Sequence, residues 1–78
     1  MVIIDDIEVY PLTLKQAKQA TKYFTKFNID LIEVALLVEE SREAILEVIK
    51  LATKLSDEEI NELDIATIPK IIRASIGA

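Results

Sequence analysis

The feature that most constrains this chain is a helix-start signature that recurs along it. A Ser, Thr or Asp stands three residues before a Glu or Gln at Thr13–Gln16, Asp30–Glu33 and Ser56–Glu59. In such a capping box, the first side chain accepts the backbone N–H of the fourth residue, and the fourth side chain reaches back to the first N–H. Three helix starts within 78 residues divide the chain into short helices.

The segment after the first start predicts an amphipathic helix. One face of that helix is apolar and the other is basic. The apolar face holds Leu14, Ala17, Ala20, Phe24 and Phe27, and the basic stripe holds Lys15, Lys18, Lys22 and Lys26. Such a stripe is typical of a solvated helix face, although it could also dock an acidic partner or a phosphate backbone.

The middle of the chain is its most apolar part. Residues 31–38 are apolar almost all round, so we expect this second helix to be the buried centre of the domain. We expect it to end near Glu39 or Glu40, with Ser41 capping a third helix, although a single bent helix is the alternative. The inward face of the third helix is predicted to hold Ala44, Ile45, Val48, Ile49, Ala52 and Leu55.

The acidic run that opens at Ser56 raises the question of a metal site. Asp57, Glu58 and Glu59 fill the first turn of a short helix, where the helix dipole favours negative charge. The run has neither the alternating oxygen ligands nor the central glycine of a calcium loop, so we interpret it as a helix corner. Residues 67–69 (Thr-Ile-Pro) then open a last helix, which Gly77 is suited to end.

The first residues read as extended chain. Residues 2–10 are rich in β-branched residues, which predicts either one strand or a hairpin turning at Asp5–Asp6, and Pro11 ends the segment. The expected organisation is a single domain with an extended N-terminal segment (1–12) and a helical part (13–78). The fold class is mainly all-α: a compact bundle of four to five short helices with a short N-terminal β segment.

Composition excludes several kinds of chemistry. The chain has no Cys and no His, which rules out thiolate catalysis, imidazole bases and Cys/His zinc sites. No nucleophile has a base partner and no glycine loop can cradle a phosphate, so we expect no enzyme, cofactor or metal. The net charge of −5 argues against nucleic-acid binding. Without a signal peptide or an apolar run of about 20 residues, we expect a soluble, cytoplasmic protein with no membrane partner.

Two alternative functions stay open. The lysine stripe on a helix-turn-helix would suit a small DNA-binding regulator, which the acidic total disfavours. Ser41 at a helix start in an acidic helical protein would suit an acyl-carrier-like protein, but its triplet is Glu40-Ser41-Arg42 where carriers have Asp-Ser-Leu.

Two motifs together carry a resemblance to a known family. The piece IEVYPLTL (7–14) leads into the first helix, and KLSDEEINELDI (54–65) precedes the last one. In this respect the chain resembles the tail assembly chaperones of long-tailed phages, over about residues 7–76, although members often have a Gly-Lys turn where Asp5–Asp6 stands. The resemblance implies a phage- or prophage-encoded protein in the host cytoplasm, which binds the tape measure protein, and possibly tail-tube subunits, during tail assembly. In that family a longer form is often made by frameshifting.

A chaperone of this kind needs spare apolar surface. Hydrophobic residues make up 51% of the chain, and a small domain cannot bury them all. Some should therefore lie in an exposed patch or a homo-oligomer interface. The candidate partner-binding residues are Val2, Ile4, Ile7 and Val9 in the N-terminal segment and Ile68, Ile71, Ile72 and Ile76 in the last helix.

Overall fold

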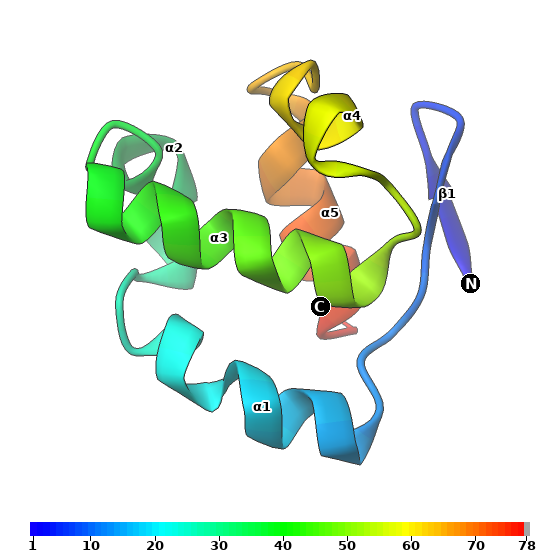
Figure 1. Ribbon diagram of the computed structural model, residues 1–78, viewed down its shortest axis with the longest axis horizontal. Coiled ribbons are helices and arrows are strands. Elements are labelled where there is room, and N and C mark those ends of the chain that lie inside the picture. The colour runs from blue at the N-terminus through cyan, green and yellow to red at the C-terminus, as the bar shows by residue number, and fades with distance from the viewer. Residues whose placement is uncertain (78) are drawn as a thin grey trace.

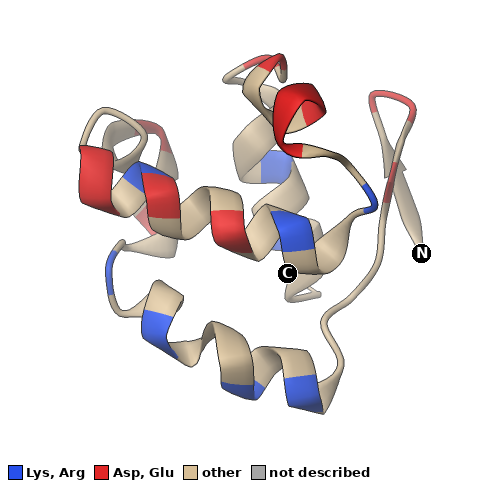
Figure 2. Cartoon of the chain, viewed as in Figure 1, with Lys and Arg blue, Asp and Glu red and all other residues tan. Residues whose placement is uncertain are grey.

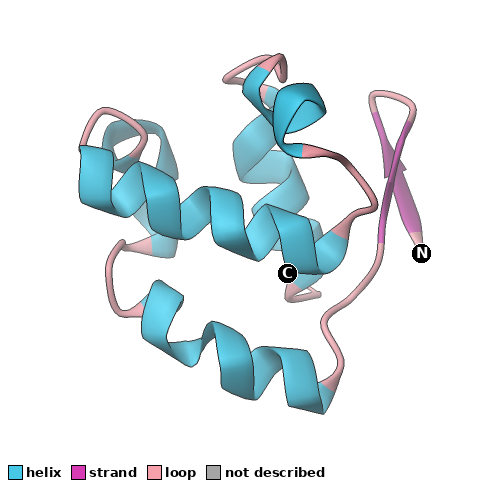
Figure 3. Ribbon diagram, in the orientation of Figure 1, coloured by secondary structure: helices cyan, strands magenta, loops and turns pink. Residues whose placement is uncertain are grey.

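A computed structural model describes residues 1–77 as a mainly helical domain with a short N-terminal hairpin (Figures 1 and 3). This confirms the predicted fold class. In chain order the elements are β1 (Val2–Ile4), β2 (Ile7–Val9), α1 (Leu14–Phe24), the 3-10 helix η1 (Ile29–Leu31), α2 (Ile32–Ala35), α3 (Glu39–Ala52), α4 (Asp57–Asn61) and α5 (Thr67–Ser75).

The N-terminal segment forms a β-hairpin with a two-residue turn, which is one of the two predicted possibilities. Strands β1 and β2 pair antiparallel, with Ile4 opposite Ile7. The turn residues Asp5 and Asp6 have φ values of 49° and 67°, the left-handed pair that a type I′ turn requires. The Thr67 hydroxyl donates to Asp5 Oδ2 at 2.6 Å, which joins the turn to the start of α5.

Helix α3 is the centre of the bundle, with α1 and α5 packed against it (Figure 1). Its predicted inward residues from Ala44 to Ala52 are all buried, and Leu55, just beyond its end, is half-buried. The hairpin packs against α5. Buried apolar side chains from these elements form one core: Val9, Ala20, Ile32, Leu36, Ala44, Ile45, Val48, Ile49, Ala52, Ile60, Ile68, Ile71 and Ile72.

Two of the three predicted capping boxes are confirmed. Thr13 and Gln16 bond reciprocally at the start of α1, and Ser56 and Glu59 do the same at α4. The box at Asp30 is wrong. Asn28 lies two residues earlier, and its Oδ1 accepts the Asp30 N–H at 2.9 Å, so a 3-10 turn begins there instead.

The predicted end of the second helix near Glu39 or Glu40 and the predicted cap at Ser41 are also wrong, because α2 ends at Ala35. The prediction of two separate helices is correct. Helix α3 begins at Glu39, after Val38, which is extended and makes no side-chain cap. Ser41 therefore lies inside the first turn, and its hydroxyl donates to the backbone carbonyl of Lys26 at 2.7 Å. This bond links α3 to the end of the segment that follows α1.

The last helix begins and ends close to the predicted positions. Pro69 is the third residue of α5, where its missing N–H costs no hydrogen bond. Gly77 has φ +77°, and its N–H donates to the carbonyl of Ala74 at 3.2 Å. The left-handed conformation that ends the helix is the one that glycine adopts without strain.

Candidate functional site

Half of the predicted partner-binding residues belong to the core. Val9, Ile71 and Ile72 are 0% exposed and Ile68 is 6% exposed, so the expectation that they offer spare surface is wrong. The reason is that α5 packs across α3 and also against the hairpin, so its apolar side closes the core from both directions. The pattern on a single helix could not show this second contact.

The other four lie at or near the surface. Val2 and Ile76 are exposed, and Ile4 and Ile7 are half-buried against the core. Met1 and Ile3 add exposed apolar area to the hairpin. These side chains belong to the hairpin and to the end of α5, and the hollow that Ile76 lines contains no residue of the hairpin.

A second group of exposed large apolar residues lies elsewhere, at the turn through η1 and α2. We call it the aliphatic corner and define it by Leu31, Val34, Leu37 and Val38, which are 53–78% exposed. The expectation that residues 31–38 form the buried centre is therefore wrong. Only Ile32 and Leu36, one turn apart, are buried, because so short a helix at the edge of the bundle presents one side to the core.

Sequence reasoning missed the corner, although its signal was present. A helix that is apolar on all sides is buried only if other elements cover each of those sides. Helix α2 spans four residues, and the chain has too few other elements to surround it. Residues 31–38 could therefore not all be buried in one subunit.

Acidic side chains border the aliphatic corner, and two of them form ion pairs. Glu40 lies 2.7 Å from Lys26 Nζ, and Glu33 lies 3.9 Å from Arg73. The hydrogen bond with Lys26 lowers the pKa of Glu40, and the same bond raises the pKa of Lys26. Asp30 and Glu39 carry further negative charge in the same segment.

A shallow apolar hollow lies at the residues that precede this corner in the chain. Its volume is about 390 Å³, and it is lined by Phe24, Phe27, Asn28, Ile29 and Ile76. The two phenylalanine rings lie 5.6 Å apart between centroids. Ile76, one of the predicted binding residues, thus lies beside the segment that leads into the corner.

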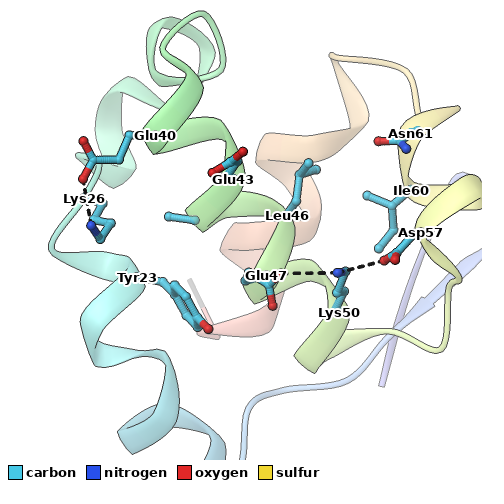
Figure 4. Close-up of a pocket in the computed structure, with 11 residues that line it drawn as sticks. Tyr23, Lys26, Glu40, Glu43, Leu46, Glu47, Lys50, Asp57, Ile60 and Asn61 are labelled. Carbon is cyan, nitrogen blue, oxygen red and sulfur yellow. Dashed lines mark hydrogen bonds and ion pairs between the residues drawn. The ribbon is translucent and has the colours of Figure 1, made fainter.

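A larger groove opens between α1, α3 and α4 (Figure 4). Its volume is about 540 Å³, and its lining consists of Tyr23, Lys26, Glu40, Glu43, Ala44, Leu46, Glu47, Lys50, Asp57, Ile60 and Asn61. Lys50 bridges two carboxylates, at 2.8 Å from Asp57 and 3.3 Å from Glu47. Hydrogen bonds to Asp57 and then to Glu47 raise the pKa of Lys50.

Charge is divided between the helices (Figure 2). Helix α1 carries lysines and no acid, while the first turns of α3 and α4 are acidic. Glu59 is engaged in its capping box, and the hydrogen bonds from Ser56 lower its pKa. Within residues 1–77, no three His, Cys, Asp or Glu side chains are grouped as a metal site would need.

We compared the chain with known proteins. Neither protein-family models, nor curated proteins, nor solved structures give a match. Among the described residues, no helix combines the length and the apolar character needed to cross a bilayer. The features that bear on function are therefore the surfaces of the chain, chiefly the aliphatic corner and the groove.

Proposed function

We propose that this chain is a non-enzymatic binding protein that covers an apolar segment of a partner with its aliphatic corner. The observation that carries the proposal is the exposure of four large aliphatic side chains within eight residues, from Leu31 to Val38. Single exposed aliphatics are normal on protein surfaces, whereas several of them gathered on one short segment are typical of an interaction site.

The partner's chemistry follows from the surroundings of the corner. An apolar strip bordered by carboxylates such as Asp30 and Glu39 suits a partner helix with an aliphatic stripe and flanking Lys or Arg. Helix-in-groove binding needs only such anchors, and the hollow beside Phe27 and Ile76 gives a second apolar foothold.

The resemblance to tail assembly chaperones supports a specific identity for this partner. We infer that the chain binds the tape measure protein, and also tail-tube subunits, in the host cytoplasm during tail assembly. Tape measure proteins are long and form coiled-coil-like helices, so their apolar stripes are exposed before the tail is assembled. A chaperone of this type binds and releases, which agrees with a patch of modest size and no catalytic group.

The proposal is tested by a charge placed in the corner. Leu37 is 78% exposed, so Leu37→Asp leaves the core intact while adding a carboxylate to the aliphatic corner. We expect the variant to lose at least about tenfold in affinity for the tape measure protein, since a buried unpaired charge is costly at an interface. Co-expression followed by co-purification and titration calorimetry would measure this.

The matched control is Ile65→Asp. Ile65 is 63% exposed and lies between α4 and α5, outside the corner. If the proposal holds, Ile65→Asp binds the tape measure protein like the unchanged chain. If both variants bind equally well, or if the unchanged chain fails to bind and solubilise the tape measure protein, the proposal is refuted.

A further inference from the structure

The outer edge of strand β1 carries backbone groups that β2 does not use. In an antiparallel ladder, pairs that exchange hydrogen bonds alternate with pairs whose N–H and C=O groups point away from the partner strand. Ile4 and Ile7 flank the two-residue turn and form a hydrogen-bonded pair, so the next pair, Ile3 and Glu8, is of the second kind. The N–H and C=O of Ile3 therefore point away from β2, along the free edge of β1.

No other part of the described chain covers this edge. The sheet has two strands, and within residues 1–77 the segment 1–9 makes no backbone–backbone hydrogen bond outside the hairpin. The side chains along β1 are also open, since Met1 is 64%, Val2 47% and Ile3 62% exposed. The hairpin lies at one side of the molecule, next to the bundle and not inside it (Figure 3). Another chain can therefore reach the edge.

The edge lacks the devices that usually protect an exposed strand. Such strands commonly carry a lysine, a proline or a bulge, which prevents them from pairing with another chain. Strand β1 reads Val-Ile-Ile, and its register with β2 is continuous, without a bulge. These residue types favour extended structure. An unprotected apolar edge of this kind can accept a third strand from a partner, which is the mode of recognition called β-augmentation.

The hairpin is held in place by the rest of the fold, so a new strand would join a preformed template. The Thr67 hydroxyl fixes the turn through Asp5 at 2.6 Å. After β2, the Tyr10 N–H donates to the carbonyl of Ala52 at 2.8 Å, and Val9 is fully buried. A template that is ordered before binding lowers the entropic cost of adding a strand.

The charge around the edge indicates which kind of strand fits it. The first 14 residues include three acids, Asp5, Asp6 and Glu8, and no Lys or Arg. None of these acids forms an ion pair within the described chain. A second copy of β1 would bring the same acids, on a chain whose net charge is −5, so two copies would repel each other. A strand with a Lys or Arg beside the turn would be attracted.

We propose that the free edge of β1 binds an extended segment of a partner protein as a third strand. Ile3 exchanges main-chain hydrogen bonds with the segment, and Val2 and Ile3 contact apolar side chains on its two faces. A Lys or Arg of the segment lies beside the Asp5–Asp6 turn. The aliphatic corner suits a helix, whereas this edge requires an extended chain, so the proposal does not depend on the proposed function.

The probe is a synthetic peptide of alternating valine and threonine with a lysine at each end. It is titrated into the isotope-labelled chain, and amide resonances are followed by NMR. We expect the Ile3 amide to exchange with solvent at least about tenfold more slowly when the peptide is bound, while the Ile4 amide, already paired with Ile7, changes less. A matched peptide with glutamate at each end should bind at least about fivefold more weakly at low salt.

Ile3→Pro tests the main-chain hydrogen bond itself. Proline removes the outward N–H, which takes no part in the ladder with β2, and proline is tolerated on edge strands. We expect this variant to bind the lysine peptide at least about tenfold more weakly. Ile3→Val is the matched control, because it keeps both the N–H and the β-branched side chain, and it should bind like the unchanged chain.

A second measurement leaves the protein unaltered, in case the proline disturbs the hairpin. The same lysine peptide with its internal amide nitrogens methylated can donate no main-chain hydrogen bond to the edge. It should bind the unchanged chain at least about tenfold more weakly than the unmethylated peptide.

Other results would overturn the proposal. An unchanged exchange rate at Ile3, equal binding of the lysine and glutamate peptides, or equal binding of the methylated peptide would each refute it. Sedimentation velocity without peptide tests the other occupant: a dimer that Ile3→Pro abolishes would assign the edge to a second copy and refute the basic partner. Leu37→Asp should bind the lysine peptide like the unchanged chain, and a loss there would place the peptide at the aliphatic corner instead.

Discussion

Replacing Ile71 by Ala tests the central difference between the sequence prediction and the structure. Ile71 is 0% exposed in α5, and the change removes three methylene-sized groups. At about 0.8 kcal/mol per buried group, the lost transfer free energy is about 2.4 kcal/mol. The cavity left behind adds to this, which brings the expected loss of unfolding free energy to about 2–5 kcal/mol.

That loss is large for a domain of this size. At about 0.05–0.15 kcal/mol per residue, 78 residues give a total stability of roughly 4–12 kcal/mol. Ile76→Ala provides a control in the same helical segment with the same chemical change. Ile76 is 44% exposed and lines an open hollow, so its truncation leaves no closed cavity and should cost only about 1 kcal/mol.

Urea unfolding followed by circular dichroism at 222 nm would measure both variants against the unchanged chain. We expect Ile71→Ala to lower the urea midpoint strongly with little change in the denaturant slope. A shift of the midpoint at constant slope reports a change in stability. If Ile71→Ala costs no more than Ile76→Ala, then α5 does not close the core. The apolar side of α5 would then be exposed and available for binding, as predicted from the sequence.

Two further predictions concern the hairpin turn and the second capping box. Asp6→Gly should raise the thermal midpoint, because Asp6 has φ 67° and glycine adopts that conformation without strain, while Asp5 keeps its bond with Thr67; an unchanged or lower midpoint in thermal melts would contradict this. The lowered pKa of Glu59 means that its stabilising effect is present above the ordinary value of 4.5 and is lost as pH falls through the folded-state value. The midpoint difference between the unchanged chain and Glu59→Gln should therefore shrink from about pH 6 to about pH 3 in melts at constant ionic strength, and a constant difference would refute the assignment.

Local signals in the sequence were sufficient for several elements. The capping boxes at Thr13 and Ser56 depend on two side chains three residues apart, so no tertiary information is needed to find them. The inward face of α3 was also predictable, because its apolar residues recur over 14 residues with one period. The Asp5–Asp6 turn could be offered only as an option, since aspartate tolerates the left-handed region less readily than glycine.

The remaining features depend on which elements meet. Ser41 has the residue type of a cap, but the carbonyl of Lys26 lies within reach of its hydroxyl, and only the packing of two segments creates that bond. The burial of Ile71 and Ile72 likewise depends on α5 lying against α3 and the hairpin at once. For the candidate site, exposed aliphatic side chains were expected and are present, but none of the eight candidate residues belongs to the aliphatic corner, and four of them are buried.

The positions of the core and the aliphatic corner suggest that stability and binding are separable in this chain. The core is closed by α3, α5 and the hairpin, while the segment through η1 and α2 buries Ile32 and Leu36 in it and packs Ile29 and Ala35 against its edge. A charge at Leu37 therefore removes no core contact, whereas a truncation at Ile71 removes many and leaves the corner unchanged. The two variants should affect different properties. Leu37→Asp should unfold at the normal midpoint and bind the partner at least about tenfold more weakly. Ile71→Ala should bind normally when folded but unfold at a lower midpoint. If Leu37→Asp also lost several kcal/mol of stability, on the scale of core truncations, the corner would be structural and the division between core and surface would fail.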